Sequence, residues 1–152
     1  MSLDTVRTFF AEHAPDIEVV VTQDSSATVA LAATAHGVAP EQIAKTLAVR
    51  VGDTNLLIVA SGTARLDNRK FRDRFGGKAR MLDAEQVVEL TSHPVGGVCP
   101  FGLPHPLPIF CDTSLQPFEE VVPAAGATNA AVRLSPERLM SLTGASWVDV
   151  CQ

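Results

Sequence analysis

Apolar residues recur at helical spacing in several segments of this chain, and residues that start or stop helices bound these segments. Val6, Phe9 and Phe10 share one side of a first helix, which Pro15 ends. Asp67 and Ser135 are placed to cap the starts of two later helices. Further helical segments are predicted over residues 26–37, 39–45, 67–76, 83–91 and 135–144.

Between these segments, runs of β-branched and other apolar residues predict strands. The clearest case is a hairpin in which residues 45–52 and 54–62 turn across "GDTN". Other strands are predicted over residues 17–22, 107–112, 119–125, 130–135 and 147–150. Because short turns join several strands and the helices are interspersed irregularly, the order favours an α+β fold. We expect a mixed, mainly antiparallel curved sheet or barrel with surrounding helices.

The composition is typical of one globular domain over residues 1–152. Hydrophobic residues make up 46% of the chain and charged residues 19%, which argues against disorder. The first residues lack the apolar run of a signal peptide, and no stretch reaches the ~20 apolar residues that a membrane helix needs. We therefore expect a cytoplasmic protein, without a membrane partner, whose three cysteines are reduced.

The formal net charge of −5 argues against general affinity for nucleic acid. Despite the negative net charge, cationic residues are concentrated in one segment, "ARLDNRKFRDRFGGKAR". It contains Arg65, Arg69, Lys70, Arg72, Arg74, Lys78 and Arg80. Such a run is usually a solvated helix surface, and the alternative is a surface that contacts phosphates.

Lys45 is the first candidate for chemistry. In an extended strand, Lys45, Leu47 and Val49 share one face, while Thr46 and Ala48 share the other. A lysine that begins an apolar face can simply extend its ammonium into water at the edge of the core. It can also hold an ammonium at the mouth of a pocket, where it suits an anion or a polarised carbonyl.

The segment "HPVGGVCPFGLPHPLPIFCD", residues 93–112, is too rich in proline and glycine for a helix. Gly96 and Gly97 permit close approach of the backbone to a ligand, and Pro94 and Pro100 stiffen the chain around them. Such a loop either lines a binding site with its main-chain groups or serves only as a structural crossover.

Cysteine and histidine recur in the same loop at intervals of six residues: His93, Cys99, His105 and Cys111. Both residue types bind zinc, but structural zinc sites use close pairs of ligands, which this spacing lacks. A Cys99–His nucleophile is a second possibility, without an evident orienting acid. We favour a small buried thiol and predict no metal and no cofactor.

Five segments together resemble the YbaK/EbsC group of aminoacyl-tRNA deacylases. They are "IAKTLAV", "LLIVASG", "LDNRKFRDRFGGKARMLDAEQVVELTSHPVGGVCPFGL", "IFCDTSL" and "VVPAAGATNAAVRLSPERL". The resemblance runs in order from about residue 24 to about residue 139. The group contains freestanding proteins and the editing domain that is inserted in many bacterial prolyl-tRNA synthetases.

The resemblance implies a set of site residues. Lys45 matches the key lysine of the group, and residues 96–100, "GGVCP", match its Gly-x-x-x-Pro loop, whose backbone holds the reacting end of the substrate. We predict catalytic roles for Lys45, Gly96 and Gly97, and substrate binding by Thr46, Val98, Cys99, Pro100, Gly126 and Asn129. We assign tRNA binding to Arg69, Lys70 and Arg74. Some relatives have a histidine in the segment 124–132, where this chain has none.

The resemblance implies a trans-editing hydrolase. Its substrate would be a mischarged aminoacyl-tRNA, with tRNA(Pro) carrying alanine, cysteine, serine or threonine as the leading candidate. The alternative is a non-catalytic module that binds aminoacyl-tRNA or a synthetase. We expect a monomer, and prolyl-tRNA synthetase is a candidate partner.

Overall fold

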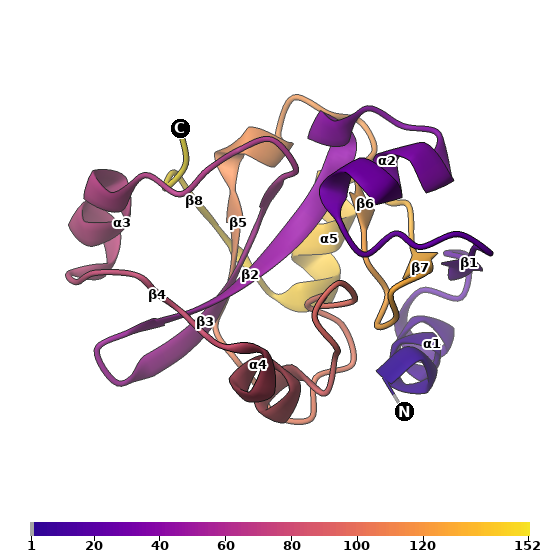
Figure 1. Cartoon of the computed structure of the whole chain (residues 1–152), viewed down its shortest axis with the longest axis horizontal. Coiled ribbons are helices and arrows are strands. Elements are labelled where there is room, and N and C mark those ends of the chain that lie inside the picture. The colour runs from indigo at the N-terminus through magenta and orange to yellow at the C-terminus, as the bar shows by residue number, and fades with distance from the viewer. Residues whose placement is uncertain (1) are drawn as a thin grey trace.

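The computed structural model describes residues 2–152, and a mixed sheet of six strands forms its centre (Figure 1). β2 (Ile43–Val51) and β3 (Thr54–Ser61) form the antiparallel hairpin that the sequence predicts. Gly52 occupies the turn with φ 57°, a left-handed conformation that favours glycine. This hairpin carries Lys45 and Thr46 and is the scaffold of the candidate site.

Shorter strands extend the sheet on both sides of the hairpin. The order is β4-β2-β3-β5-β8, with β6 also paired to β2. These strands are β4 (Arg80–Met81), β5 (Ile109–Asp112), β6 (Val122–Pro123) and β8 (Ser146–Val148). β5 pairs with β3 and β8 with β5 in parallel, so the predicted α+β fold with a mixed sheet is confirmed. The sheet stays open, with β4 and β8 at its ends, and does not close into a barrel.

Three predicted strands are much shorter than the apolar runs that suggested them. β1 (Val20–Val21) and β7 (Ala130–Ala131) pair only with each other, in a separate two-stranded sheet. β6 likewise pairs with β2 over two residues. Their length is limited by the partner that each one meets in the fold, which the local sequence does not specify.

The helices begin and end close to the predicted positions, with the main difference at the start of α2. They are α1 (Ser2–His13), α2 (Val29–His36), α3 (Asn68–Phe75), α4 (Ala84–Thr91) and α5 (Pro136–Thr143). The described residues also form two 3₁₀ turns, η1 (Pro40–Gln42) and η2 (Thr113–Leu115). The helical segment predicted over residues 39–45 is wrong beyond η1, because residues 43–45 form the start of β2, which pairs with β3. Asp67 and Ser135 accept hydrogen bonds from the first turns of α3 and α5, as expected. At α2 the N-cap is Thr28, two residues after the start of the segment predicted over residues 26–37.

The core has separate apolar clusters around the sheet. Phe10 of α1 packs against Phe101 with ring centroids 4.7 Å apart, in a cluster that also contains Leu139 of α5. Phe71 of α3 packs with Val49 in a second cluster. In Figure 1, α3 lies at one end of the molecule, and α1 and α2 lie at the other. Within residues 2–152, no helix has the length and apolar character to cross a membrane.

Candidate functional site

A cavity lies beside β2, where the middle part of the outer edge of this strand is not paired with another strand. β6 pairs with β2 at Ile43 and Ala44, and β4 pairs with it at Val49 and Arg50. Residues 45–48 lie between these two short ladders, and they line a cavity of about 270 Å³. The site is therefore built on a gap in the sheet edge.

Small apolar side chains dominate the walls of the cavity. Ala32 comes from α2, Val87 from α4, and Leu82 from the residue after β4. Val98 comes from the proline-rich loop and Ala131 from β7. Ligand pockets typically measure about 300–1,000 Å³, so this cavity suits a small and mainly apolar group.

Lys45 is one of the residues that line the cavity, and its ammonium is bound by two backbone carbonyls that lie outside the lining. Nζ donates a hydrogen bond to the Gly62 carbonyl at 3.2 Å and another to the Ala64 carbonyl. Partial burial lowers the pKa of the ammonium, and the nearby Arg65 lowers it further, while Cys151 opposes the shift. The cation therefore rests on two neutral acceptors, which an anionic oxygen of a ligand could replace with a stronger bond.

The glycines of the loop have two different environments. Gly96, with φ 90°, lines the cavity together with Val98. Gly97 is buried, and a Cβ added to it would lie 2.7 Å from the Ala127 backbone nitrogen. The Gly97 carbonyl also accepts a hydrogen bond from Gly126 N–H at 3.0 Å. The missing side chain of Gly97 thus makes room for another segment of the protein, whereas the sequence suggested room for a ligand.

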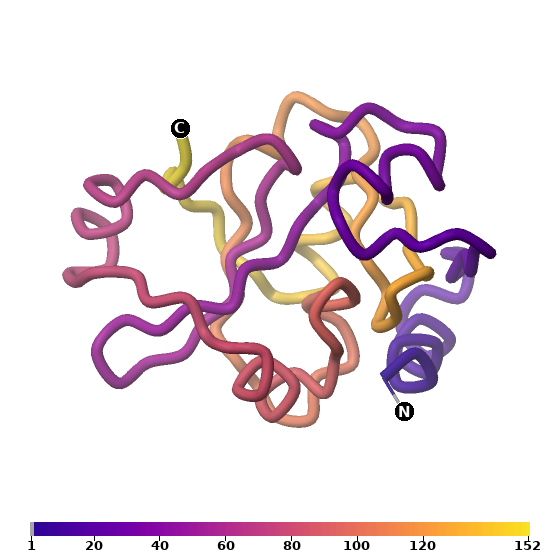
Figure 2. Tube along the Cα trace, viewed as in Figure 1, coloured from indigo at the N-terminus to yellow at the C-terminus, as the bar shows by residue number. Residues whose placement is uncertain are grey.

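Figure 2 shows the path of this loop, which leaves α4 and folds back beside the segment between β6 and β7. Gly126, in that segment, is buried with φ 90° against α1, and an added Cβ would lie 2.8 Å from the Ser2 carbonyl oxygen. The Asn129 side chain donates to the Thr22 carbonyl at 2.9 Å. Of the predicted substrate-binding residues, Thr46 and Val98 line the cavity, while Cys99, Pro100, Gly126 and Asn129 lie outside its lining. The contacts of Cys99, Gly126 and Asn129 are with other parts of the protein, and they hold the loop and the neighbouring strands in place.

Residues 23–142 match the aminoacyl-tRNA editing domain family. The chain belongs to this family, as a member of the YbaK/EbsC type. It is 46% identical over 154 residues to "Uncharacterized protein YwhH" of Bacillus subtilis (strain 168), covering all of this chain and 98% of that protein. It is 28% identical over 117 residues to "Putative Cys-tRNA(Pro)/Cys-tRNA(Cys) deacylase EbsC" of Enterococcus faecalis (strain ATCC 700802 / V583), covering 75% and 71% of the two chains.

Solved structures share the fold along the whole chain. A structure described as "a putative trans-editing enzyme for prolyl tRNA synthetase" has a TM-score of 0.92 and 34% identity, with 99% of this chain and 97% of that chain covered. The hypothetical protein APE2540 has a TM-score of 0.89 and 32% identity, with 97% and 99% covered. The resemblance drawn from the five sequence segments is thereby confirmed.

The Cys99–His pair exists in this editing domain, but it lies in the core. Cys99 Sγ is 3.5 Å from His93 Nε2, and neither residue is exposed to solvent. Burial raises the pKa of the Cys99 thiol to about 12 and lowers the pKa of His93. His93 Nε2 also lies 2.7 Å from the Phe101 carbonyl, and Nδ1 bonds to the Ser2 hydroxyl, so no carboxylate orients the ring. A protonated thiol without access to substrate is a structural residue.

We accordingly expect Cys99→Ala to retain deacylation within about threefold of the wild-type kcat/KM. The Cys99 side chain lies in the core cluster and is not part of the cavity lining, so its loss removes only a small volume from the core. The measurement is deacylation by the purified variant, alongside the wild type treated with a thiol-modifying reagent. A loss of a hundredfold in a variant with normal thermal stability would instead make Cys99 a nucleophile.

The four spaced cysteines and histidines do not come together as one group, although Cys99 and His93 are neighbours. His105 is exposed on the loop, whereas Cys111 is buried in β5. Within residues 2–152, no three His, Cys, Asp or Glu side chains form a group that could hold a metal ion. Sequence spacing alone therefore does not define a ligand set here.

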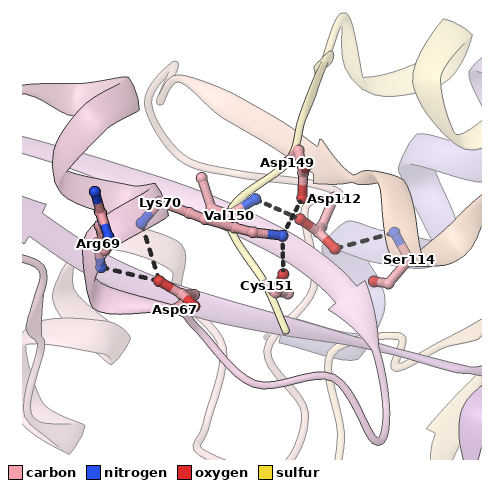
Figure 3. Close-up of polar contacts among 8 residues, drawn as sticks. All are labelled: Asp67, Arg69, Lys70, Asp112, Ser114, Asp149, Val150 and Cys151. Atoms are coloured by element: carbon pink, nitrogen blue, oxygen red, sulfur yellow. Dashed lines mark hydrogen bonds and ion pairs between the residues drawn. The ribbon is translucent and has the colours of Figure 1, made fainter.

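The basic segment of the editing domain includes α3, and its cationic side chains differ in whether they already have a partner within the protein. Lys70 Nζ pairs with Asp149 at 3.0 Å and donates to the Cys151 carbonyl at 2.9 Å (Figure 3). Arg74 lies 5.0 Å above the ring of Phe75. Arg69 is exposed to solvent. The three predicted tRNA-binding residues therefore lie on one helix, but Lys70 and Arg74 already interact with other groups of the protein.

A buried carboxylate fixes the C-terminal segment that faces α3. Asp112, only 1% exposed, accepts from Val150 N–H at 2.9 Å and from Ser114 N–H at 3.0 Å (Figure 3). The segment in turn carries Cys151, which lies near the Lys45 ammonium. No motif in the sequence marks Asp112 or the cavity walls from α2 and β4, so neither could be predicted as part of the site.

Proposed function

We propose that this protein is an aminoacyl-tRNA deacylase that hydrolyses the ester bond of tRNA charged with a small non-cognate amino acid. The observation that carries the proposal is the small apolar cavity at the open edge of β2, with Lys45 beside it. Membership of the editing domain family supports the reaction class. The relatives named for prolyl-tRNA synthetase and Cys-tRNA(Pro) make tRNA(Pro) the leading candidate substrate.

The reaction does not require a side chain that forms a covalent bond to the substrate. An aminoacyl ester is already activated, so positioning and electrostatic stabilisation can supply much of the acceleration. We assign the Lys45 ammonium to the ester carbonyl or the terminal phosphate, where it exchanges two neutral acceptors for an anionic one. The backbone around Gly96 orients the attacking water, and the ribose hydroxyl beside the ester helps to activate it.

The cavity limits the size of the amino acid. Ala32, Ala44, Ala48, Ala131 and Val87 are among the residues that line it, so we infer that alanine, serine, cysteine and threonine are the candidate side chains. The test is a screen of tRNA(Pro) charged with these four amino acids, with proline and with leucine. We expect release of one or more of the four small amino acids and none of leucine. Equal release of leucine would contradict the proposed role of the cavity.

The alternative is a module of the same fold that binds aminoacyl-tRNA or a synthetase without catalysis. The two functions have opposite effects on the ester, because a deacylase accelerates its hydrolysis whereas a binder shields it from water. Incubating each mischarged tRNA with an excess of the protein separates them. Release faster than the spontaneous rate supports the deacylase, and slower release supports the binder.

We expect the triple variant Arg69→Ala, Lys70→Ala, Arg74→Ala to raise the KM for aminoacyl-tRNA several-fold and to flatten its dependence on salt. Contacts between cations and phosphates release counterions, so their loss weakens binding most at low salt. The choice of amino acid should not change, because the cavity lies elsewhere. Arg7→Ala, on the exposed surface of α1, is the control. An unchanged KM and salt slope would mean that tRNA is held by another surface or by a synthetase partner.

A further inference from the structure

Thr46 presents its main chain to the gap in the edge of β2. Leu82 N–H donates to the Ala48 carbonyl at 3.1 Å, so the polar backbone groups of Ala48 point toward β4. In an antiparallel strand these groups alternate in direction, and Thr46 therefore points its N–H and C=O to the same edge. The ladder with β4 begins at Val49 and the ladder with β6 ends at Ala44, so neither strand reaches Thr46.

The side chain of Thr46 is also unsatisfied. Its Oγ1 is buried and has no hydrogen-bond partner among the described residues. The other polar side chains that line the cavity are all engaged: Ser26 with the Thr128 carbonyl, Thr28 with Leu31 N–H, and Lys45 with two carbonyls. A buried hydroxyl without a partner costs stability, so its presence beside a cavity points to a ligand that supplies the bond.

The carbonyl and the hydroxyl oxygen of Thr46 are both acceptors that no neighbouring strand or side chain among the described residues engages, so they suit a ligand group that donates hydrogen bonds. None of the described residues that line the cavity is acidic. An aminoacyl ester carries an α-ammonium group, which needs acceptors when it leaves water. Lys45 and Thr46 are consecutive strand residues whose side chains point to opposite faces, so the lysine cation and a second cation at Thr46 would lie on different sides of β2.

We propose that Thr46 anchors the α-ammonium group of the aminoacyl ester through its carbonyl oxygen and its hydroxyl. This inference rests on the proposed deacylase function and adds the recognition of a free amino group to it. The anchor fixes the ester relative to Lys45, which precedes Thr46 in the strand. Acyl groups that lack the ammonium, such as α-hydroxyacyl groups of the same size, are therefore poor substrates.

The test compares alanyl-tRNA(Pro) with lactyl-tRNA(Pro), in which a hydroxyl replaces the α-ammonium. For the wild type we expect kcat/KM to be about tenfold or more lower with the lactyl ester, as for the loss of a hydrogen bond to a charged group. Thr46→Val keeps the shape of the side chain and removes the hydroxyl. It should lose activity with the alanyl ester, so the ratio of kcat/KM for the alanyl ester to that for the lactyl ester should fall several-fold. Thr46→Ser should retain the ratio, and Thr54→Val, at an exposed position of β3, is the control.

Thermal unfolding and a ligand titration give readouts besides activity. Thr46→Val should not lower Tm, because the hydroxyl has no partner in the free protein. In the wild type, a non-hydrolysable alanyl amide of 3′-amino-3′-deoxyadenosine should shift the Thr46 amide resonance and slow its hydrogen exchange. An unchanged alanyl-to-lactyl ratio in Thr46→Val, or an unaffected Thr46 amide at saturating ligand, would overturn the anchor. Failure of the wild type to release any amino acid would instead overturn the deacylase function itself.

Discussion

The Lys45→Ala variant is expected to lose about a hundredfold or more in kcat/KM for deacylation, equivalent to about 3 kcal/mol of transition-state stabilisation. The reason is that Lys45 is the sole cationic residue of the cavity lining among the described residues, and an anionic substrate oxygen can replace the two carbonyl acceptors of its ammonium. No other group there can balance negative charge on the ester carbonyl or the terminal phosphate. Steady-state hydrolysis of a mischarged tRNA by the purified variant measures the effect.

The fold should survive this change. Lys45 is half-buried and contributes two hydrogen bonds, to the carbonyls of Gly62 and Ala64. Their loss should lower Tm by no more than about 5 °C. Lys78→Ala, at an exposed position after α3, is the matched control and should leave kcat unchanged. A Lys45→Ala variant with near wild-type deacylation would remove the lysine from the mechanism.

The second large effect is expected at Gly97. Replacement by valine would place Cβ 2.7 Å from the Ala127 nitrogen and 2.9 Å from its Cα, and backbone cannot move aside as a flexible side chain can. The loop would have to separate from the segment of Gly126, with loss of the hydrogen bond between them. We expect Tm to fall by about 10 °C or more and deacylation to be lost.

Gly37→Ala provides the comparison for Gly97. Gly37 has φ 67° but no atom within 4 Å of an added Cβ, so alanine there is strained without a clash. Thermal unfolding should show a clearly smaller decrease in Tm for Gly37→Ala than for Gly97→Val. Normal stability combined with lost activity in Gly97→Val would mean that the loop can shift, and that Gly97 acts on the substrate directly.

The sequence predicted those parts of the fold that local interactions determine. The hairpin of β2 and β3 follows from alternation and the turn at Gly52, and α3 follows from the cap at Asp67 and the stop at Gly76. It did not predict β4, because two residues carry no strand pattern of their own. The gap in the edge of β2 depends on where β4 and β6 end, so it follows from tertiary packing alone.

As with the fold, only some residues of the candidate site could be predicted from the sequence. Alternation placed Lys45 on a face of β2, and the loop pattern marked Gly96 and Val98, which line the cavity with it. The sequence could not reveal that Gly97 packs against Ala127, because a glycine that approaches a ligand and one that approaches another segment look the same. Nor could it show that the Thr46 hydroxyl lacks a partner.

Release of alanine from alanyl-tRNA(Pro) by substoichiometric protein tests the central claim most directly. One molecule of an enzyme clears many molecules of substrate, whereas a binder acts at most once. We predict an initial rate proportional to protein concentration, many turnovers, and about a hundredfold slower release by Lys45→Ala. If release does not exceed the spontaneous rate with alanyl-tRNA(Pro), nor with its seryl, cysteinyl and threonyl counterparts, the protein is not the deacylase proposed.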